Sequence, residues 1–176
     1  SDVFNGFDSD YDIVTSNLVD PGNFALASTP VAENPVLADF GAMDGGRMFL
    51  GYSDRQGEVV YQVNELPVEE NFSYIFKLHG RLAKENSTYN QSLKVLVNDE
   101  TIIEDFKIDK STEWQSVSAL WKPGTARKAT IKILNHNLDT QDAFFALDSI
   151  SFVQSVQDTA KFTAKVVPNF SYGSDG

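Results

Sequence analysis

Short apolar runs that alternate with polar residues constrain the fold of this sequence more than any other feature. Apolar side chains recur at every second position, and clusters of Gly, Pro, Asn and Asp separate the runs. A period of two places alternate side chains on one face of a strand, whereas a helix requires a period near 3.6. The pattern therefore predicts an all-β fold, and we expect a two-sheet antiparallel β-sandwich.

The alternating pattern places most of the predicted strands in the second and third quarters of the chain. The first 45 residues differ, because Pro and Gly interrupt every apolar run, so we expect ordered loops there with one short strand near residues 11–15. Tight turns are predicted at 98–100, where Asn and Asp tolerate positive φ, and at 121–125. The expected sandwich strands are 47–52, 58–63, 71–82, 92–97, 101–108, 114–121, 127–135 and 143–153.

The length of 176 residues favours a single domain, and the hydrophobic fraction of 41% is enough to build a sizeable core. We assign residues 1–155 to this domain and 156–176 to a C-terminal extension. Within the extension, 161–167 has the pattern of an added strand and 168–176 the composition of a linker. No apolar run approaches the roughly 20 residues that a membrane span requires, so membrane insertion is not expected.

The charge and the cysteine count exclude several kinds of site. A net charge of −11 argues against nucleic acid or an anionic membrane as a partner, because both require a basic face. The absence of cysteine excludes disulfides, a thiolate nucleophile and a thiolate zinc site. Calcium is a more natural partner than nucleic acid for so many carboxylates, although a solvated acidic surface is the more frequent explanation of such a composition. The spacing of Asp8, Asp10 and Asp12 resembles an EF-hand loop, but Ile13 and Val19 replace the required Gly and Glu.

Several stretches, in one order along the chain, resemble the calcium-binding jelly-roll carbohydrate-binding modules. These are galactose-binding-like β-sandwiches of bacterial polysaccharide-degrading enzymes and surface adhesins, and the resemblance covers roughly residues 4–153. The stretches that carry it are NGFD at 5–8, DGGRMFL at 44–50, VYQV at 60–63, YIF at 74–76, LKVLVN at 93–98, WQ at 114–115, WKPG at 121–124, ATIKI at 129–133 and FFALDSISF at 144–152.

The resemblance implies a jelly roll with a structural calcium ion held by Asp8 and Asp148, which would meet at one edge of the sandwich. Asn5 and Asp44 lie in stretches that can supply further oxygens, the ligands that calcium prefers. The sequence departs from the family in having Asp8 where Glu is usual and Ser149 where a second Asp is usual. A metal-free alternative stays open, in which Asp148 caps a turn or accepts backbone N–H bonds.

Two kinds of surface are candidates for ligand binding. Alternation places cationic side chains on outward strand faces, where they would suit an anionic glycan such as a uronate or a sulfated sugar. The same side chains also suit an ordinary solvated face with lysines protecting an edge. The candidates of this kind are Lys77, His79, Arg81, Lys132 and His136.

Aromatic side chains near predicted loops are the second kind of candidate, because aromatic faces stack on sugar C–H groups. Tyr52 and Tyr89 are the preferred contacts, with Tyr11 a further one. Trp114 and Trp121 lie in alternating segments and are expected in the core. Two further polar residues, Asn135 and Asn137, are either sugar contacts or turn residues.

We therefore predict a non-catalytic carbohydrate-binding module that is stabilised by calcium and recognises a polysaccharide or surface glycan. No Gly-x-Ser-x-Gly or His-Glu-x-x-His motif is present, and no pair of acids stands out by spacing. The resemblance implies a monomeric module of a larger multidomain protein, outside the cell, either secreted or on a bacterial surface. The alternative is a structural or adhesive domain that uses calcium for rigidity or binds a protein partner.

Overall fold

The computed structural model describes residues 6–155 and 162–163. The predicted ligand Asn5 and the predicted linker at 168–176 lie outside the described residues. Within them, the helix α1 (Pro30–Glu33) is a single turn that begins at a proline. No described helix has the length and apolar character needed to cross a membrane.

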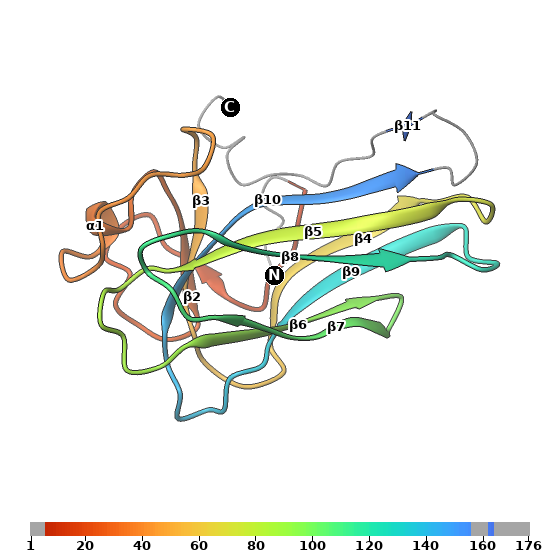
Figure 1. The fold of residues 1–176 in the computed structure, drawn as a ribbon. Helices are drawn as coiled ribbons and strands as arrows, with labels where there is room; N and C mark the ends of the chain where they lie inside the picture. The colour runs from red at the N-terminus through yellow and green to blue at the C-terminus, as the bar shows by residue number, and fades with distance from the viewer. Residues whose placement is uncertain (1–5, 156–161, 164–176) are drawn as a thin grey trace.

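Two sheets form the two layers of the fold (Figure 1). The larger sheet has seven strands. Six of them lie in the order β1 (Asp12–Ile13), β2 (Asn23–Ala27), β3 (Met48–Tyr52), β10 (Phe144–Ser155), β5 (Ser73–Leu82) and β8 (Gln115–Trp121). The seventh, β11 (Phe162–Thr163), pairs with β10. The four-stranded sheet has the order β4 (Val59–Pro67), β9 (Lys128–Asn135), β6 (Gln91–Val97) and β7 (Glu100–Ile108).

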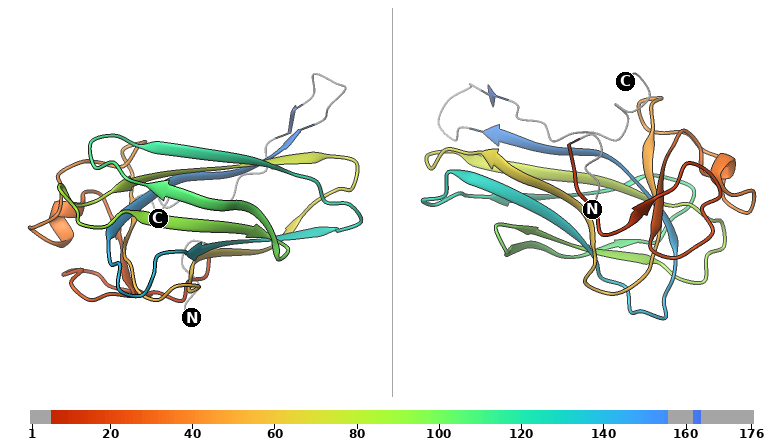
Figure 2. Two further views of the ribbon diagram at one scale, coloured as in Figure 1. Left: turned by 60° about the horizontal axis from the view of Figure 1, so that its bottom comes forward. Right: turned by 180° about the vertical axis from the view of Figure 1, so that it is seen from behind.

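Almost all strand pairs are antiparallel, the short β1–β2 pair being parallel. The further views show the two sheets as separate layers with their loops gathered at the two ends (Figure 2). This architecture confirms the predicted two-sheet β-sandwich of the jelly-roll type.

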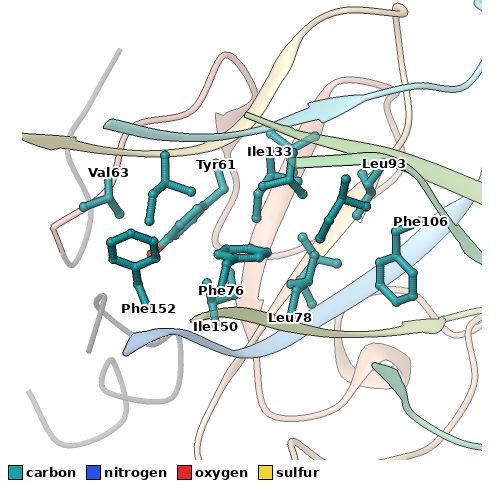
Figure 3. Close-up of a cluster of buried hydrophobic side chains, with 14 of the residues drawn as sticks. Tyr61, Val63, Phe76, Leu78, Leu93, Phe106, Ile133, Ile150 and Phe152 are labelled. Atoms are coloured by element: carbon teal, nitrogen blue, oxygen red, sulfur yellow. The ribbon is translucent and has the colours of Figure 1, made fainter. Parts of the chain in front are cut away.

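The core lies between the sheets because alternate residues of each strand point inward. Along β5, Phe76 and Leu78 are buried while Ile75 and Lys77 are exposed. Facing them from the other sheet, β6 and β9 contribute buried side chains such as Ile133. Figure 3 shows these side chains meeting between the two layers. A second, smaller apolar cluster covers part of the outer face of the seven-stranded sheet, where the segment around α1 packs on β3 and β10.

The predicted strands lie close to the observed ones, and the predicted turns have the expected geometry. Asn98 and Asp99 have φ of 48° and 64°, as a two-residue hairpin turn requires, and Gly124 has φ of 60°. The sequence did not predict β2 or α1. Pro21-Gly22 and Pro30 flank β2 closely, and its pairing with β3 comes from the tertiary fold rather than from local alternation.

Strand β10 contains a β-bulge that changes which residues face the core. Between Asp148 and Ser151, β10 has one more residue than the paired segment of β5, and Ser149 adopts φ of 48°. Phe145 and Leu147 face the core before the bulge, and Ile150 and Phe152 face it afterwards. Asp148 consequently points to the outer side although apolar residues surround it in the sequence.

Gly51 in β3 fills a position that has no room for a side chain. A Cβ atom there would lie 2.7 Å from Cζ of Phe145 and 2.9 Å from Cε1 of Phe49. We expect Gly51→Ala to lower the free energy of unfolding by about 1–3 kcal/mol, because overpacking displaces these rings. Denaturant unfolding measures the change. Gly41→Ala is the matched control, since its nearest heavy atom is Ser28 O at 4.0 Å, and equal midpoints for the two variants would contradict the packing described.

Candidate functional site

A cleft of about 430 Å³ lies at one end of the sandwich, within the size range of small-molecule sites. It is formed by the end of β3, the loop between β5 and β6, and the loop between β9 and β10. Both loops extend from the same end of the sheets (Figure 1). The lining residues that matter for its chemistry are Tyr52, Lys84, Asn86, Tyr89, Asp142 and Phe144.

A stacked aromatic pair forms one wall of the cleft. Tyr52 and Phe144 are directly opposite in the β3–β10 ladder, and their ring centroids are 4.0 Å apart with the planes inclined by 29°. The Tyr52 hydroxyl donates a hydrogen bond of 2.9 Å to Oδ2 of Asp142. Both rings are partly exposed, so the pair presents an apolar surface whose position is fixed by the sheet.

Polar side chains of both hydrogen-bonding types border this aromatic wall. The Lys84 ammonium donates, the Asp142 carboxylate accepts, and the Asn86 amide does both. A hydrogen bond of 2.7 Å from Ser87 Oγ to the carbonyl of Tyr89 holds the turn that carries Tyr89. The cleft therefore combines an apolar face with donors and acceptors around it.

Asn137 ties the two cleft loops together from a buried position. Its Nδ2 donates 2.9 Å hydrogen bonds to the carbonyls of Asn90 and Gln141, which are the chain neighbours of Tyr89 and Asp142. Its Oδ1 accepts a 2.7 Å bond from the Ser92 N–H. One side chain that is 3% exposed thus fixes the spacing of both loops.

Asn135 connects the loop after β3, which follows Tyr52, to the same hydrogen-bond network. Its Nδ2 donates to the carbonyls of Asp54 and Arg55 at 3.1 and 3.0 Å. Its Oδ1 accepts from Gln91 Nε2 at 2.9 Å and from Ser53 Oγ at 3.3 Å. Asn135 and Gln91 are fully buried, and buried amides that find all their partners make a rigid network.

Two of the predicted ligand contacts, Tyr52 and Tyr89, are brought together in this cleft. Sequence reasoning did not find Phe144, Lys84, Asn86 or Asp142 as cleft residues, because no local pattern reveals which loops converge. It offered two roles for Asn135 and Asn137, and their burial makes them structural residues of the loops rather than exposed contacts. Trp121 is buried in the main core, and Trp114 packs against the second cluster.

The predicted cationic residues of β5 share the outer face of the seven-stranded sheet. Lys77 is exposed, and His79 lies within 3.3 Å of the Ser149 carbonyl through Nδ1. Arg81 is occupied by structural contacts: Nε donates to the Ser111 carbonyl at 2.8 Å, and its guanidinium carbon lies 3.8 Å from the Phe40 ring centroid. Burial lowers the pKa of Arg81, and Glu85 partly offsets this.

Lys132 and His136 belong to β9 and the residue after it, and so to the other sheet. Lys132 Nζ lies 3.7 Å from Asp99 Oδ1, and the His136 carbonyl accepts a 3.5 Å bond from Gln56 Nε2. The five predicted cationic residues are therefore divided between the two sheets and do not form one patch. Their role in ligand binding stays a prediction.

The predicted metal ligands Asp8 and Asp148 are held by different sheets. Asp8 pairs with Gln62 of β4 in the four-stranded sheet, and its Oδ2 accepts a 2.8 Å bond from Asn64 Nδ2. Asp148 lies in β10 of the seven-stranded sheet. Within residues 6–155 and 162–163, no group of three or more His, Cys, Asp or Glu side chains is placed to hold a metal ion.

Asp148 is fully buried, and backbone N–H groups occupy both of its oxygens. Oδ2 accepts from Met43 at 2.9 Å, and Oδ1 accepts from Ser149 at 2.7 Å. Burial raises the pKa of Asp148, the two N–H bonds and His79 oppose the rise, and nearby Asp44 adds to it. The carboxylate thus fastens the loop at Met43 to the β-bulge. The calcium role of Asp148 stays a prediction.

Comparison with known proteins identifies the fold. The C-terminal domain of EclA, a sugar-binding protein, has a TM-score of 0.52 at 10% identity, covering 72% of this chain and 88% of that domain. The CBM22-1 xylan-binding domain of Xyn10C from Paenibacillus barcinonensis has a TM-score of 0.51 at 11% identity, covering 69% and 80%. The chain shares the fold of these carbohydrate-binding modules.

An arabinose-bound α-L-arabinofuranosidase, MgGH51, also has a TM-score of 0.51, at 10% identity. The match covers 74% of this chain and 21% of that much longer enzyme. By sequence, the chain matches no protein-family model and no curated protein. The shared feature is therefore the sandwich itself, and the cleft must be interpreted from its own residues.

The amide network predicts a specific loss of stability. We expect Asn137→Ala to lower the free energy of unfolding by about 1–3 kcal/mol, because it leaves the Asn90 and Gln141 carbonyls without their donor. Asn64→Ala is the matched control: this exposed amide donates to Asp8 and accepts from Gln62, both side chains at the surface, so its loss should change stability by less than about 0.5 kcal/mol. Chemical unfolding of both variants gives the comparison, and equal stability would contradict a tethering role.

Proposed function

We propose that this chain is a non-catalytic carbohydrate-binding module and that it binds sugar in the cleft at the end of the sandwich. The observation that carries the proposal is the partly exposed stack of Tyr52 on Phe144 beside Lys84, Asn86 and Asp142. A pyranose ring has an apolar C–H face and a border of hydroxyls, and the cleft has the matching surfaces. The shared fold with sugar-binding and xylan-binding domains supports the proposal.

The composition of the cleft favours binding over hydrolysis. Glycoside hydrolysis usually requires two carboxyl groups on opposite sides of the scissile bond. Asp142 is the one carboxylate among the described residues that line the cleft, and it already accepts the Tyr52 hydroxyl. An acid held in this way is suited to orienting a sugar hydroxyl.

The size and setting of the cleft also favour a module of a larger protein. Its volume suits a short saccharide. Tight binding to a long polysaccharide would therefore require this site to act together with binding sites on other modules. The 21% coverage of MgGH51 supports a place within a longer chain. We extend the proposal to a monomeric module that works outside the cell, secreted or on a bacterial surface.

Removal of single aromatic rings from the cleft tests the proposed site. We expect Tyr52→Ala and Tyr89→Ala to weaken saccharide binding by roughly tenfold or more, which corresponds to about 1.4 kcal/mol. The reason is that each variant removes a ring that contacts the C–H face of the sugar. Titration calorimetry with a ligand found on a glycan array measures the effect. Tyr89 is included because it does not pack in either apolar cluster, so its loss should spare the fold.

Lys77→Ala is the matched control, because Lys77 is exposed on the outer face of the seven-stranded sheet. It should leave saccharide affinity unchanged. Loss of binding in this variant, with normal affinity in Tyr52→Ala, would move the site to the sheet face. A glycan array without any hit would favour the alternative, a structural or adhesive domain with a protein partner.

We also propose that calcium stabilises the fold, as the family resemblance implies. The proximity of Asp44 to the buried Asp148 supports this, since a cation would offset the repulsion between the two carboxylates. We expect added calcium to raise the melting temperature and a chelator to lower it again, because an ion bound by the native state alone stabilises that state.

Two variants make the calcium experiment specific. Asp44→Asn should reduce the calcium-dependent shift, whereas Asp39→Asn, at an exposed acid of the same segment, should retain it. Identical melting curves of the unmodified chain in calcium and in chelator would rule out the ion. Asp148 would then be held by the Met43 and Ser149 N–H groups alone.

A further inference from the structure

We infer that the cleft selects a neutral saccharide and discriminates against uronates and sulfated sugars. The inference rests on the proposed function and names the ligand class of that same site. It departs from the anionic ligand that the cationic strand residues suggested, because none of those residues lines the cleft.

The charges in the cleft balance one another. Lys84 is the one cation and Asp142 the one anion among the described residues that line it. An anionic sugar is usually held by an arginine fork or by several cations, which supply more than one charge-assisted hydrogen bond. A lining with one lysine and one carboxylate offers no such excess of positive charge.

The negative charge lies at the aromatic wall itself. Asp142 is bonded to the Tyr52 hydroxyl at 2.9 Å, so the carboxylate is held beside the ring on which the sugar would stack. Burial raises the pKa of Tyr52, and the bond and charge of Asp142 together with the charge of Asp20 raise it further. A ligand carboxylate or sulfate at this wall would be repelled by the negative charge of Asp142.

Arg81, the one arginine among the predicted cationic residues, is unsuited to anion binding. Arg81 donates through Nε to the Ser111 carbonyl and lies over the Phe40 ring, so these contacts already use part of its guanidinium. Arg81 is also not among the residues that line the cleft. Neutral hydroxyls, in contrast, suit a donor such as Lys84 and an acceptor such as Asp142 equally.

The test compares matched sugars on the intact chain by titration calorimetry. The probes are short hexose oligosaccharides of several linkages, each paired with the hexuronate that differs only in having a carboxylate at C6. We expect a neutral member to bind at least about tenfold more tightly than its uronate. Its affinity should change by less than about twofold between about 0.01 M and about 1 M salt, because no ion pair forms.

Asp142→Asn identifies the source of the discrimination. The amide oxygen can still accept the Tyr52 hydroxyl, so the aromatic wall should keep its arrangement. Because the amide carries no charge, the ratio of uronate affinity to neutral-sugar affinity should rise, whatever the change in the neutral affinity itself. Asp139→Asn is the matched control in the same loop, because Asp139 accepts a hydrogen bond from the Gln56 N–H and does not line the cleft. In this variant the ratio of uronate to neutral affinity should stay as in the unmodified chain.

Three outcomes would overturn the inference in distinguishable ways. A uronate that binds as tightly as its neutral partner, with affinity falling as salt rises, would establish an anion site and leave the proposed function intact. If Asp142→Asn left the ratio of uronate to neutral affinity unchanged, the charge of Asp142 would not be the cause of the discrimination. Absence of binding by every saccharide would refute the proposed function and this inference together.

Discussion

The β-bulge in β10 is the constraint on which the rest of the structure depends. Strand β10 pairs with β3, β5 and β11, and the extra residue at the bulge allows Phe145 and Leu147 to share the core with Ile150 and Phe152. Without the bulge, one of these two pairs would face the outside of the sheet. Burial of each such side chain stabilises the fold by about 1.5–3 kcal/mol, so a regular strand would be less stable here. Asp148 fixes the bulge by accepting the Ser149 N–H, and fixes the adjacent loop through Met43.

The same bulge determines where the aromatic wall lies. Before it, Phe144 and Ala146 face the outer side, where the second apolar cluster covers Ala146 and leaves Phe144 partly exposed at the strand end. The ladder then places Tyr52 directly opposite Phe144. Strand β10 therefore contributes both to the core and to the cleft. The bulge after Asp148 shifts the alternation, so that core-facing residues occur on both sides of it.

Alternation along the chain was sufficient to predict the sandwich, its main strands and the turn at Asn98 and Asp99, because these features depend on local periodicity and φ. It was not sufficient for β2, which is stabilised by pairing with β3. Tyr52 and Tyr89 were chosen individually as loop aromatics, but their meeting in one cleft depends on loop paths that local sequence does not encode. The cationic residues failed to form one patch for the same reason, since alternation gives the face of a strand and not the sheet to which it belongs.

The buried amides explain how polar loops form a site of fixed shape. Loops with few apolar residues have little hydrophobic burial to hold them, so Asn135 and Asn137 hold them through hydrogen bonds to their carbonyls. Gln91 supports this arrangement by donating to Oδ1 of Asn135. Ordering a side chain on binding costs about 0.5–1.5 kcal/mol, and a wall that is already ordered avoids this cost. Such a saving matters most for a neutral ligand, which gains no long-range attraction from the protein. In a chain with a net charge of −11, an anionic ligand would in addition approach against the overall field.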